Sequence, residues 1–427
     1  MSGPYRSRPH VGGRSVARGE HMQPSDVVDG PPSEVVMALG FSTWGDARRR
    51  DFGFSPDRMA RALLEDPDIA DVTVVDAFRS RLGRAKNWRQ PRAEGFPHGP
   101  DRRIVHPLRW ARRDPLGQER VVRHYRSLDR RLATLGRRRS AAPVLVTCHP
   151  VHAAVADRSV WRDVVYYAWD DWLSYPLMTQ WRPVTAWAYS RMAAQRTNVI
   201  GVTPAIIDRI GSERSTVIPN GVDVSEVRDL PAPPAWFDQL RRPVAFYSGS
   251  LQQRVDTDAI AAAARDLPDW DFCLVGPMVD PRPFDQLAAV PNVHIHERVP
   301  RAEVLAMAAA ASVCLVPHRR TEMTVAMSPL KLYEYAAVGT PIVATDLPSI
   351  RGVTDRMVLV EPGAPQAAAI LAAAQMPPAD QASLWQWRLQ HDWSNRYVAW
   401  RAAALSTDAA RTSTYRREGA TGSGGDA

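Results

Sequence analysis

Residues 328–346, with the sequence SPLKLYEYAAVGTPIVATD, specify a short helix followed directly by a buried strand. Ser328 is a good N-cap residue, and Pro329 suits the first helical position. Gly339 fits the left-handed position after a helix, and Pro341 prevents the helix from continuing. The four residues that follow Pro341 are rich in β-formers and bounded by turn residues, which predicts a buried strand.

Lys331 and Glu334 are three residues apart and therefore share one face of this helix. Lys331 lies in the first turn, where free N–H groups and the helix dipole favour an anion. Glu334 lies about 4.5 Å further along the axis. Lysine and arginine together number 54, and only Lys86 and Lys331 are lysines. A lysine can follow a phosphate into a tight space that excludes a planar guanidinium. The layout suits a nucleoside diphosphate, although an ordinary solvated Lys–Glu pair satisfies it equally.

Length and composition define the class of protein. A chain of 427 residues predicts two or three domains, and 45% hydrophobic residues with 14 tryptophans indicate a globular protein. The three cysteines form neither a disulfide framework nor a zinc pattern, so a reducing, intracellular location is expected. We find no signal-peptide pattern and no run of about 18 apolar residues, so no membrane-spanning helix is expected.

The net charge of +8 allows three kinds of partner, namely nucleic acid, an anionic membrane surface or acidic substrates. No zinc-finger, RNA-recognition or basic-zipper pattern accompanies the arginines, so nucleic acid is not expected. Simple solvated faces explain most of the charge. The remaining hypothesis is a cytoplasmic protein with peripheral attachment to the inner face of the cell membrane.

The order strand, glycine loop, helix, strand opens the chain and is typical of a parallel α/β sheet. Strands are expected over 35–39 and 71–76, whereas 80–117 has poor periodicity and reads as an inserted or connecting region. The glycines after the first strand do not match a dinucleotide fingerprint. Ligands bind at the carboxyl ends of strands in open α/β sheets. We therefore select loop residues Gly40, Ser42 and Trp44, with a plain surface loop as the alternative.

Two further strand ends carry ionisable side chains. His149 follows the strand at 143–147 and is a candidate base or hydrogen-bond donor, although lone histidines are more often structural. Asp170 and Asp171 follow the strand at 163–167, and one of them is a candidate general base or acceptor-binding residue. Adjacent carboxylates point in different directions, so at most one of them should enter a cleft. The alternative is an exposed acidic turn beside core tryptophans.

The second half repeats the strand-and-loop pattern from residue 243. Gly249 and Ser250 allow a close backbone approach to a phosphate, and Arg254 can add a charge-assisted contact. The loop at 318–327 leads into the central helix and contains Glu322. The segment 381–405 has tryptophans in a helical context, which fits a terminal helix packing back on the first domain.

The stretch at 328–346 resembles the donor-binding motif of group 1 glycosyltransferases with the GT-B fold, in the subgroup with a Pro-Leu-Lys-Leu-Tyr-Glu helix. Residues 219–223, Pro-Asn-Gly-Val-Asp, are similar to the family's motif near the inter-domain hinge. The resemblance implies α/β architecture with two Rossmann-like parallel-sheet domains facing a central cleft. It implies that Lys331 contacts the diphosphate and Glu334 the donor ribose. Many members carry a second glutamate where this chain has Ala326, so Glu322 is considered as a substitute.

The resemblance also sets the expected domains and the donor-binding set. The donor-binding residues are Gly249, Ser250, Arg254, Ser328, Pro329, Leu330, Lys331 and Glu334. The expected ranges are a disordered tail over 1–33, an acceptor domain over 34–222, a linker over 223–242, a donor domain over 243–384, a C-terminal helix over 385–405 that packs on the acceptor domain, and a disordered tail over 406–427.

The implied activity is transfer of a sugar from a UDP- or GDP-sugar to a cell-envelope glycan or lipid-linked acceptor. The family needs no metal or cofactor and mostly retains the anomeric configuration. Two alternatives stay open, a nucleotide-sugar epimerase of the same fold and a non-catalytic basic binding protein. Steep salt dependence of sequence-independent DNA binding would support the second.

Overall fold

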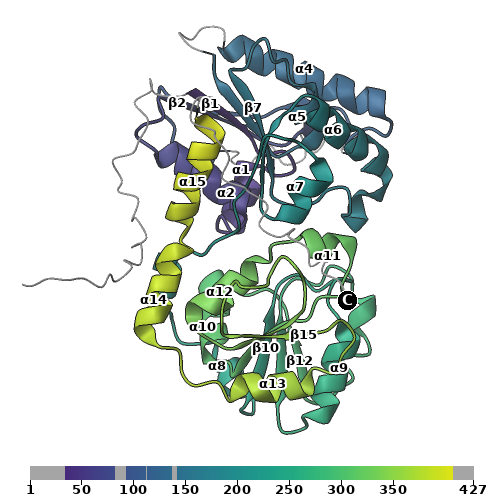
Figure 1. Cartoon of the computed structure of the whole chain (residues 1–427), viewed down its shortest axis with the longest axis vertical. Helices are drawn as coiled ribbons and strands as arrows, with labels where there is room; N and C mark the ends of the chain where they lie inside the picture. Colours follow the sequence, from purple (N-terminus) through teal and green to yellow (C-terminus); the bar gives the residue numbers. More distant parts are fainter. Residues whose placement is uncertain (1–33, 82–92, 112, 137–141, 407–427) are drawn as a thin grey trace, which may run out of the picture. The chain divides into compact units, whose positions relative to one another are not determined.

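Two parallel β-sheets, each accompanied by helices, make up the described part of the chain (Figure 1). The computed structural model describes residues 34–81, 93–111, 113–136 and 142–406. These residues belong to one compact unit, Pro32–Ala427. The first sheet has the strand order β4-β2-β1-β6-β7-β8-β9, and the second has the order β12-β11-β10-β13-β14-β15. Every strand pair in both sheets is parallel, as the strand–helix alternation predicts.

The first sheet and its helices come from the first half of the chain. Their elements are β1 (Glu34–Ala38), α1 (Trp44–Arg49), α2 (Ser55–Glu65), β2 (Asp71–Val75), β3 (Arg79–Ser80), β4 (Arg102–Val105), β5 (Leu108–Arg109), α4 (Gln118–Gly136), β6 (Val144–Thr147), α5 (Pro150–Val155), β7 (Asp163–Ala168), η1 (Pro176–Trp181), α6 (Arg182–Ala194), β8 (Asn198–Gly201), α7 (Pro204–Ile210) and β9 (Ser215–Val217). The short strands β3 and β5 pair separately.

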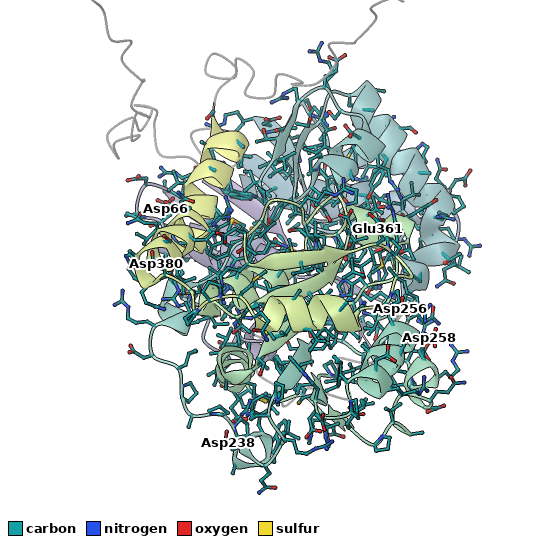
Figure 2. All side chains as sticks on the ribbon, turned by 60° about the horizontal axis from the view of Figure 1, so that its bottom comes forward. Asp66, Asp238, Asp256, Asp258, Glu361 and Asp380 are labelled. Carbon is teal, nitrogen blue, oxygen red and sulfur yellow. The ribbon has the colours of Figure 1, made fainter. Side chains whose placement is uncertain are left out.

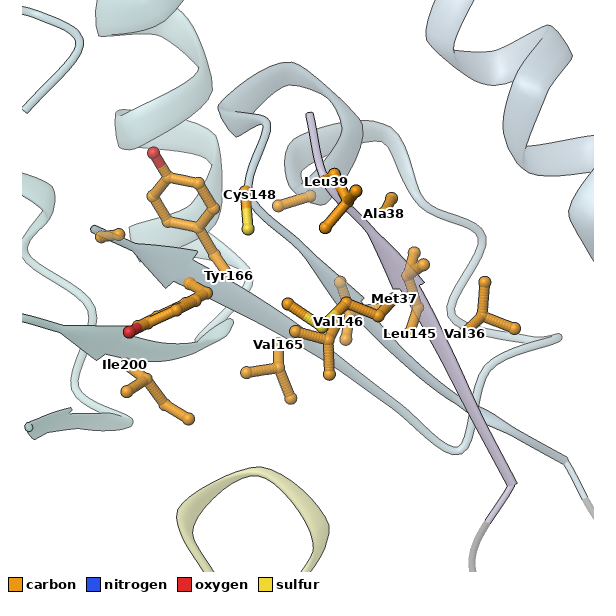
Figure 3. Close-up of a cluster of buried hydrophobic side chains, with 14 of the residues drawn as sticks. Val36, Met37, Ala38, Leu39, Leu145, Val146, Cys148, Val165, Tyr166 and Ile200 are labelled. Atoms are coloured by element: carbon orange, nitrogen blue, oxygen red, sulfur yellow. The ribbon is translucent and has the colours of Figure 1, made fainter. Parts of the chain in front are cut away.

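The central strands of the first sheet are continuous apolar runs because helices cover both of their faces. Met37 of β1 is in register with Val146 of β6, which is in register with Val165 of β7. These side chains form a row of buried contacts in the core (Figure 3). The carboxyl ends of β1, β6 and β7 therefore lie at one edge of the sheet.

The second sheet and the terminal helices follow. Their elements are η2 (Val224–Val227), α8 (Ala235–Asp238), β10 (Val244–Ser248), α9 (Thr257–Asp266), β11 (Asp271–Val275), η3 (Arg282–Phe284), β12 (Val293–His296), α10 (Arg301–Ala310), β13 (Val313–Val316), α11 (Glu322–Ala326), α12 (Leu330–Val338), β14 (Ile342–Thr345), β15 (Met357–Val360), α13 (Ala367–Ala374), α14 (Gln381–Gln390) and α15 (Trp393–Leu405).

The end of the chain returns to the core of the first sheet. Trp400 is 0% exposed there, and Trp393 belongs to the same buried cluster. The hydroxyl of Tyr397 donates to Asp66, which lies beside α15 (Figure 2). The segment expected to be one helix over 385–405 is two helices, because Asp392 caps a new helix by accepting from the backbone N–H of Ser394. Of these two helices, it is α15 that contributes residues to that core.

Two further expectations differ from the structure. Helix α12 begins at Leu330 with Pro329 at the N-cap position, so Ser328 is not the cap. The carbonyl of Ser328 instead accepts from the side-chain amide of Asn220, 2.7 Å away. The region over 80–117 adds an edge strand, β4, whose Arg102 side chain donates to carbonyls at the end of α2 and in the α2–β2 connection. The tails over 1–33 and 407–427 lie outside the described residues, and the other domain boundaries stay predictions.

Candidate functional site

The side chain of Lys331 is buried in the first turn of α12 without a hydrogen-bond partner. The residue is 9% exposed, and no atom of the described residues accepts a hydrogen bond from its Nζ. Its ammonium lies 3.7 Å from the centre of the Tyr247 ring. Burial, and then the charge of Arg254, hold the pKa of Lys331 well below its ordinary value, while Glu334 opposes this shift. The first turn of α12 therefore has a buried basic group that lacks a counterion.

Gly249, at the carboxyl end of β10, makes room for this side chain. Its φ of +134° disfavours an L side chain, and a Cβ there would lie 2.7 Å from Nζ of Lys331. A Cβ on Gly276 would lie 2.0 Å from the carbonyl oxygen of Gly249, so the β10 and β11 ends also pack closely. The backbone N–H of Ser248 donates to the hydroxyl of Tyr335 at 2.7 Å, which holds α12 against β10. Gly249 and Lys331 thus lie together as expected from the sequence.

Arg254 supplies a second cation near Lys331. Its Nη1 contacts the sulfur of Met327 at 3.6 Å, and its buried Nε has no hydrogen-bond partner in the described part of the chain. Among the described residues, no carboxylate forms an ion pair with it. Its charge is close enough to lower the pKa of Lys331, and Glu334 offsets only part of the shift. Because uncompensated buried charge is unfavourable, this arrangement is suited to an anionic ligand.

Glu334 lies on the same helix but is held by another residue. Its Oε1 accepts from Nη1 of Arg301 at 2.6 Å, and Nε of Arg301 donates to Glu226 at 2.6 Å. These two carboxylates raise the pKa of Arg301, although burial opposes them. Among the described residues, Lys331 and Glu334 do not form the ion pair that their spacing allows. Arg301 was not among the predicted site residues, because its only local signal is its position after Pro300 at the start of α10.

The adjacent carboxylates after β7 have different surroundings. Asp171 is buried and accepts from Arg209 at 2.7 Å and from Ser174 at 2.5 Å, so it supports the loop. Asp170 is half-buried, and its Oδ1 accepts from the backbone N–H of Asp171. Burial raises the pKa of Asp170 to about 6, although this backbone hydrogen bond and the charge of Arg254 lower it. Of the two adjacent carboxylates, Asp170 is therefore the one whose pKa is lowered by the charge of Arg254.

His149 lies at the N-cap position of α5 in an aromatic environment. Its ring stacks on Tyr125, with centroids 4.0 Å apart, and lies 4.6 Å from the Phe41 ring. Burial lowers the pKa of His149 well below its ordinary value, so the ring is neutral, and its Nδ1 has no hydrogen-bond partner among the residues that the structure describes. Gly40, with φ +72°, packs directly on this loop, because a Cβ there would lie 2.9 Å from the carbonyl carbon of Cys148.

The other two residues of the first loop have partners of their own. The hydroxyl of Ser42 accepts from Arg50 at 2.6 Å. Trp44 is buried, and its indole N–H donates to the carbonyl of Glu94 at 3.3 Å. Neither contact involves Lys331 or Arg254, so these two side chains stabilise the loop.

Glu322 lies in α11 and pairs with Arg182 at 3.1 Å and Arg209 at 3.5 Å. It also lines a cavity of about 570 Å³. The cavity lining includes Ser174, Tyr175, Leu177 and Arg182, which follow β7, and Gln252, Arg254, Val279 and Met323 around the second sheet. Glu322 and Arg254 therefore line the same cavity, whereas Ser250 and Lys331 do not line it.

The described residues contain no group of three or more His, Cys, Asp or Glu side chains that could hold a metal ion. No helix among the described residues is long and apolar enough to cross a membrane.

The part of the chain around the second sheet matches a known protein family. Residues 242–375 match the family model described as glycosyl transferases group 1. This segment contains Gly249, Arg254, Lys331 and Glu334 of the candidate donor-binding set. Ser328, Pro329 and Leu330 precede Lys331 within it.

One curated relative is the Bacillus subtilis (strain 168) protein TuaH, which is named as a teichuronic acid biosynthesis glycosyltransferase. It is 30% identical over 143 residues, which are 33% of this chain and 36% of TuaH. The matched region therefore spans about a third of the length of this relative.

Solved glycosyltransferase structures share the fold. Sucrose-phosphate synthase from Thermosynechococcus elongatus is 15% identical with a TM-score of 0.61, over 86% of this chain and 97% of that one. The UDP-forming trehalose-phosphate synthase from Burkholderia vietnamiensis is 13% identical with a TM-score of 0.62, over 87% and 97%. HepE from Anabaena, solved with UDP and glucose, is 14% identical with a TM-score of 0.55, over 87% and 100%. These likenesses confirm the expected GT-B fold.

Proposed function

We propose that this protein is a glycosyltransferase that uses a nucleotide-diphosphate sugar as its donor. The observation that carries the proposal is the unpartnered Nζ of Lys331, buried at the first turn of α12 beside Gly249. This pair lies inside the segment that matches the group 1 family. A diphosphate would provide the charged hydrogen-bond acceptor that no described residue provides to the Lys331 nitrogen.

The proposed chemistry depends on stabilising the departing nucleoside diphosphate. Lys331 and Arg254 would act on its developing negative charge, together with the N–H groups of the first turn of α12. The first turn of α12 is held against β10 before the donor arrives, because the N–H of Ser248 donates to the hydroxyl of Tyr335. The proposal includes a reaction that needs no metal and retains the anomeric configuration, both of which derive from the family resemblance. Glu334, already oriented by Arg301, would bind the donor ribose.

Asp170 is the proposed group for the acceptor hydroxyl, with His149 as a second candidate. A carboxylate accepts a proton only when ionised, and Asp170 has a pKa of about 6. Activity of the wild type should therefore fall as pH decreases through about 6. Asp170→Asn should lower kcat by about 10²-fold or more and remove this acidic limb. The measurement is kcat/KM against pH.

Asp208→Asn, which changes an exposed aspartate on α7, is the matched control and should leave the profile unchanged. An Asp170→Asn protein with wild-type kcat and the same acidic limb would exclude Asp170 from the reaction.

For the acceptor, we propose a cell-envelope glycan or a lipid-linked sugar. The named role of TuaH supports an envelope polysaccharide. The net charge of +8 supports peripheral attachment to an anionic membrane surface. Flotation with anionic liposomes at low and high salt tests that attachment, and protein that stays entirely in solution at low salt would overturn it.

Release of nucleoside diphosphate from a panel of UDP- and GDP-sugars tests the activity itself. A glycosyltransferase should release the diphosphate faster when a lipid-linked or glycan acceptor is present, and EDTA should not slow it. Conversion of the free nucleotide sugar without any acceptor would instead indicate an epimerase. NMR of the product determines the anomeric configuration.

A further inference from the structure

His318, just after β13, is a buried histidine with no partner for either ring nitrogen. The residue is 1% exposed, and neither Nδ1 nor Nε2 has a hydrogen-bond partner among the described residues. Strand β13 lies between β10 and β14, so His318 is at the same sheet edge as the end of β10. That edge carries Gly249 and faces the first turn of α12.

The backbone fixes His318 beside the Arg254 segment. Val255 and His318 form an antiparallel bridge. The N–H of Arg319 donates to the carbonyl of Arg254 at 2.8 Å, and the N–H of Asp256 donates to the carbonyl of Pro317 at 2.7 Å. The histidine is therefore held next to Arg254 by the main chain, independently of its own ring.

The ring shares the electrostatic surroundings of the anion site. Burial, followed by the charges of Lys331 and Arg254, lowers the pKa of His318 well below its ordinary value. The ring is therefore neutral and has one N–H donor and one acceptor nitrogen. The adjacent Arg319, in contrast, is neutralised by Asp258 at 2.7 Å and Asp256 at 3.4 Å, two carboxylates that lie together near the start of α9 (Figure 2).

Two other buried or half-buried histidines, His152 and His391, have ring nitrogens close to protein oxygen atoms, as expected for a structural role. Nδ1 of His152 lies 3.2 Å from the hydroxyl of Thr147, and its Nε2 lies 3.6 Å from Asp129. Nδ1 of His391 lies 2.8 Å from the carbonyl of Trp387. Each of these rings is oriented by a protein atom. His318 has no such atom among the described residues, although a buried polar group normally has a partner.

We propose that His318 is a third ligand of the bound donor, with one ring nitrogen donating to a diphosphate oxygen and the other accepting from a hydroxyl of the sugar. The proposal rests on the proposed function, because it assumes that the anion at Lys331 and Arg254 is a diphosphate. A neutral imidazole adds a donor to the site without adding a third positive charge. Its second nitrogen can also accept a hydrogen bond from a sugar hydroxyl, whereas the side chains of Lys331 and Arg254 can only donate.

Isothermal titration with inorganic pyrophosphate, UDP, GDP and the corresponding nucleotide sugars tests this role. His318→Phe should weaken pyrophosphate and diphosphate binding about tenfold. It should weaken binding of the nucleotide sugar by a larger factor, because both ring contacts are lost. His318→Gln retains a donor and an acceptor and should recover part of the affinity. His98→Gln, at an exposed histidine, should bind every probe like the wild type.

Thermal unfolding separates binding from a structural role. His318→Gln should retain a melting temperature close to that of the wild type, because the ring makes no hydrogen bond to another described residue that the substitution would remove. If both His318 variants bind all probes like the wild type while Lys331→Met does not, the role of His318 is overturned and the anion site stands. If Lys331→Met also binds like the wild type, the proposed function fails as well.

Discussion

Replacing Lys331 with methionine should weaken nucleoside diphosphate binding by about 100-fold and at the same time raise the melting temperature. A hydrogen bond to a charged group contributes about 1.5–3 kcal/mol, and about 2.7 kcal/mol corresponds to about 100-fold in affinity. In the free protein, however, the Lys331 nitrogen is buried and has no hydrogen-bond partner in the described ranges. Removing such a group should stabilise the fold by about 1–3 kcal/mol. Binding and stability therefore change in opposite directions.

Isothermal titration with UDP and GDP and differential scanning calorimetry measure the two effects. Arg265→Met, which removes an exposed cation at the end of α9, is the matched control and should change neither quantity. Unchanged affinity in Lys331→Met would remove this residue from the binding site, and a lower melting temperature would show that its nitrogen has a partner in the free protein.

The pH dependence of the free energy of unfolding is a separate test of the environment of Lys331. Its folded-state pKa lies well below the ordinary 10.5, mainly through burial and then through Arg254, with Glu334 opposing. In the window between these two values the unfolded chain binds more protons, so stability should rise with pH there. Diphosphate binding should reverse the shift by favouring the charged ammonium, with uptake of a proton. Lys331→Met should lack both the stability slope and the proton uptake.

Replacing Gly249 with alanine should remove most diphosphate binding, because the added Cβ would occupy the position of the lysine nitrogen. A Cβ at this position would lie 2.7 Å from Nζ and 3.1 Å from Cε of Lys331. Since the end of a lysine side chain can move, displacement of Nζ is expected to affect ligand affinity more than folding. The φ of +134° adds strain of about 1–3 kcal/mol.

Gly352→Ala is the control for backbone strain alone. Gly352 also has a positive φ, +73°, but a Cβ there would have no atom within 4 Å. It should lower stability by about 1 kcal/mol and leave UDP binding unchanged. Equal affinity of the Gly249→Ala protein and the wild type, measured by titration, would contradict the close packing of Gly249 and Lys331.

Local sequence patterns were enough to predict the parallel sheets and the end of α12. Gly339 adopts the left-handed conformation expected at the helix end, and the strand that follows is buried. These features depend on residues that are adjacent in the chain. The proximity of Gly249 and Lys331 was predictable only because each lies in a recognisable local pattern and because the stretches around them resemble motifs of a known family.

The residues that were missed depend on contacts between distant positions. Arg301 orients Glu334 from 33 positions away, and nothing near Arg301 in the sequence indicates that partner. His318 follows a predicted strand, but its lack of hydrogen-bond partners becomes visible only when the Arg254 segment lies beside it. Strand β4 was missed because it is rich in arginine, which an edge position tolerates since one side of the strand is open to solvent.

The return of α15 to the first sheet also has a consequence for biosynthesis. The strands of that sheet end at Val217, whereas Trp393, Trp400 and Ala404 complete its buried cluster. A ribosome therefore releases the whole second sheet before it releases the last side chains that the earlier core requires. Until α15 has been translated, the first sheet therefore lacks the buried side chains that α15 contributes to its core.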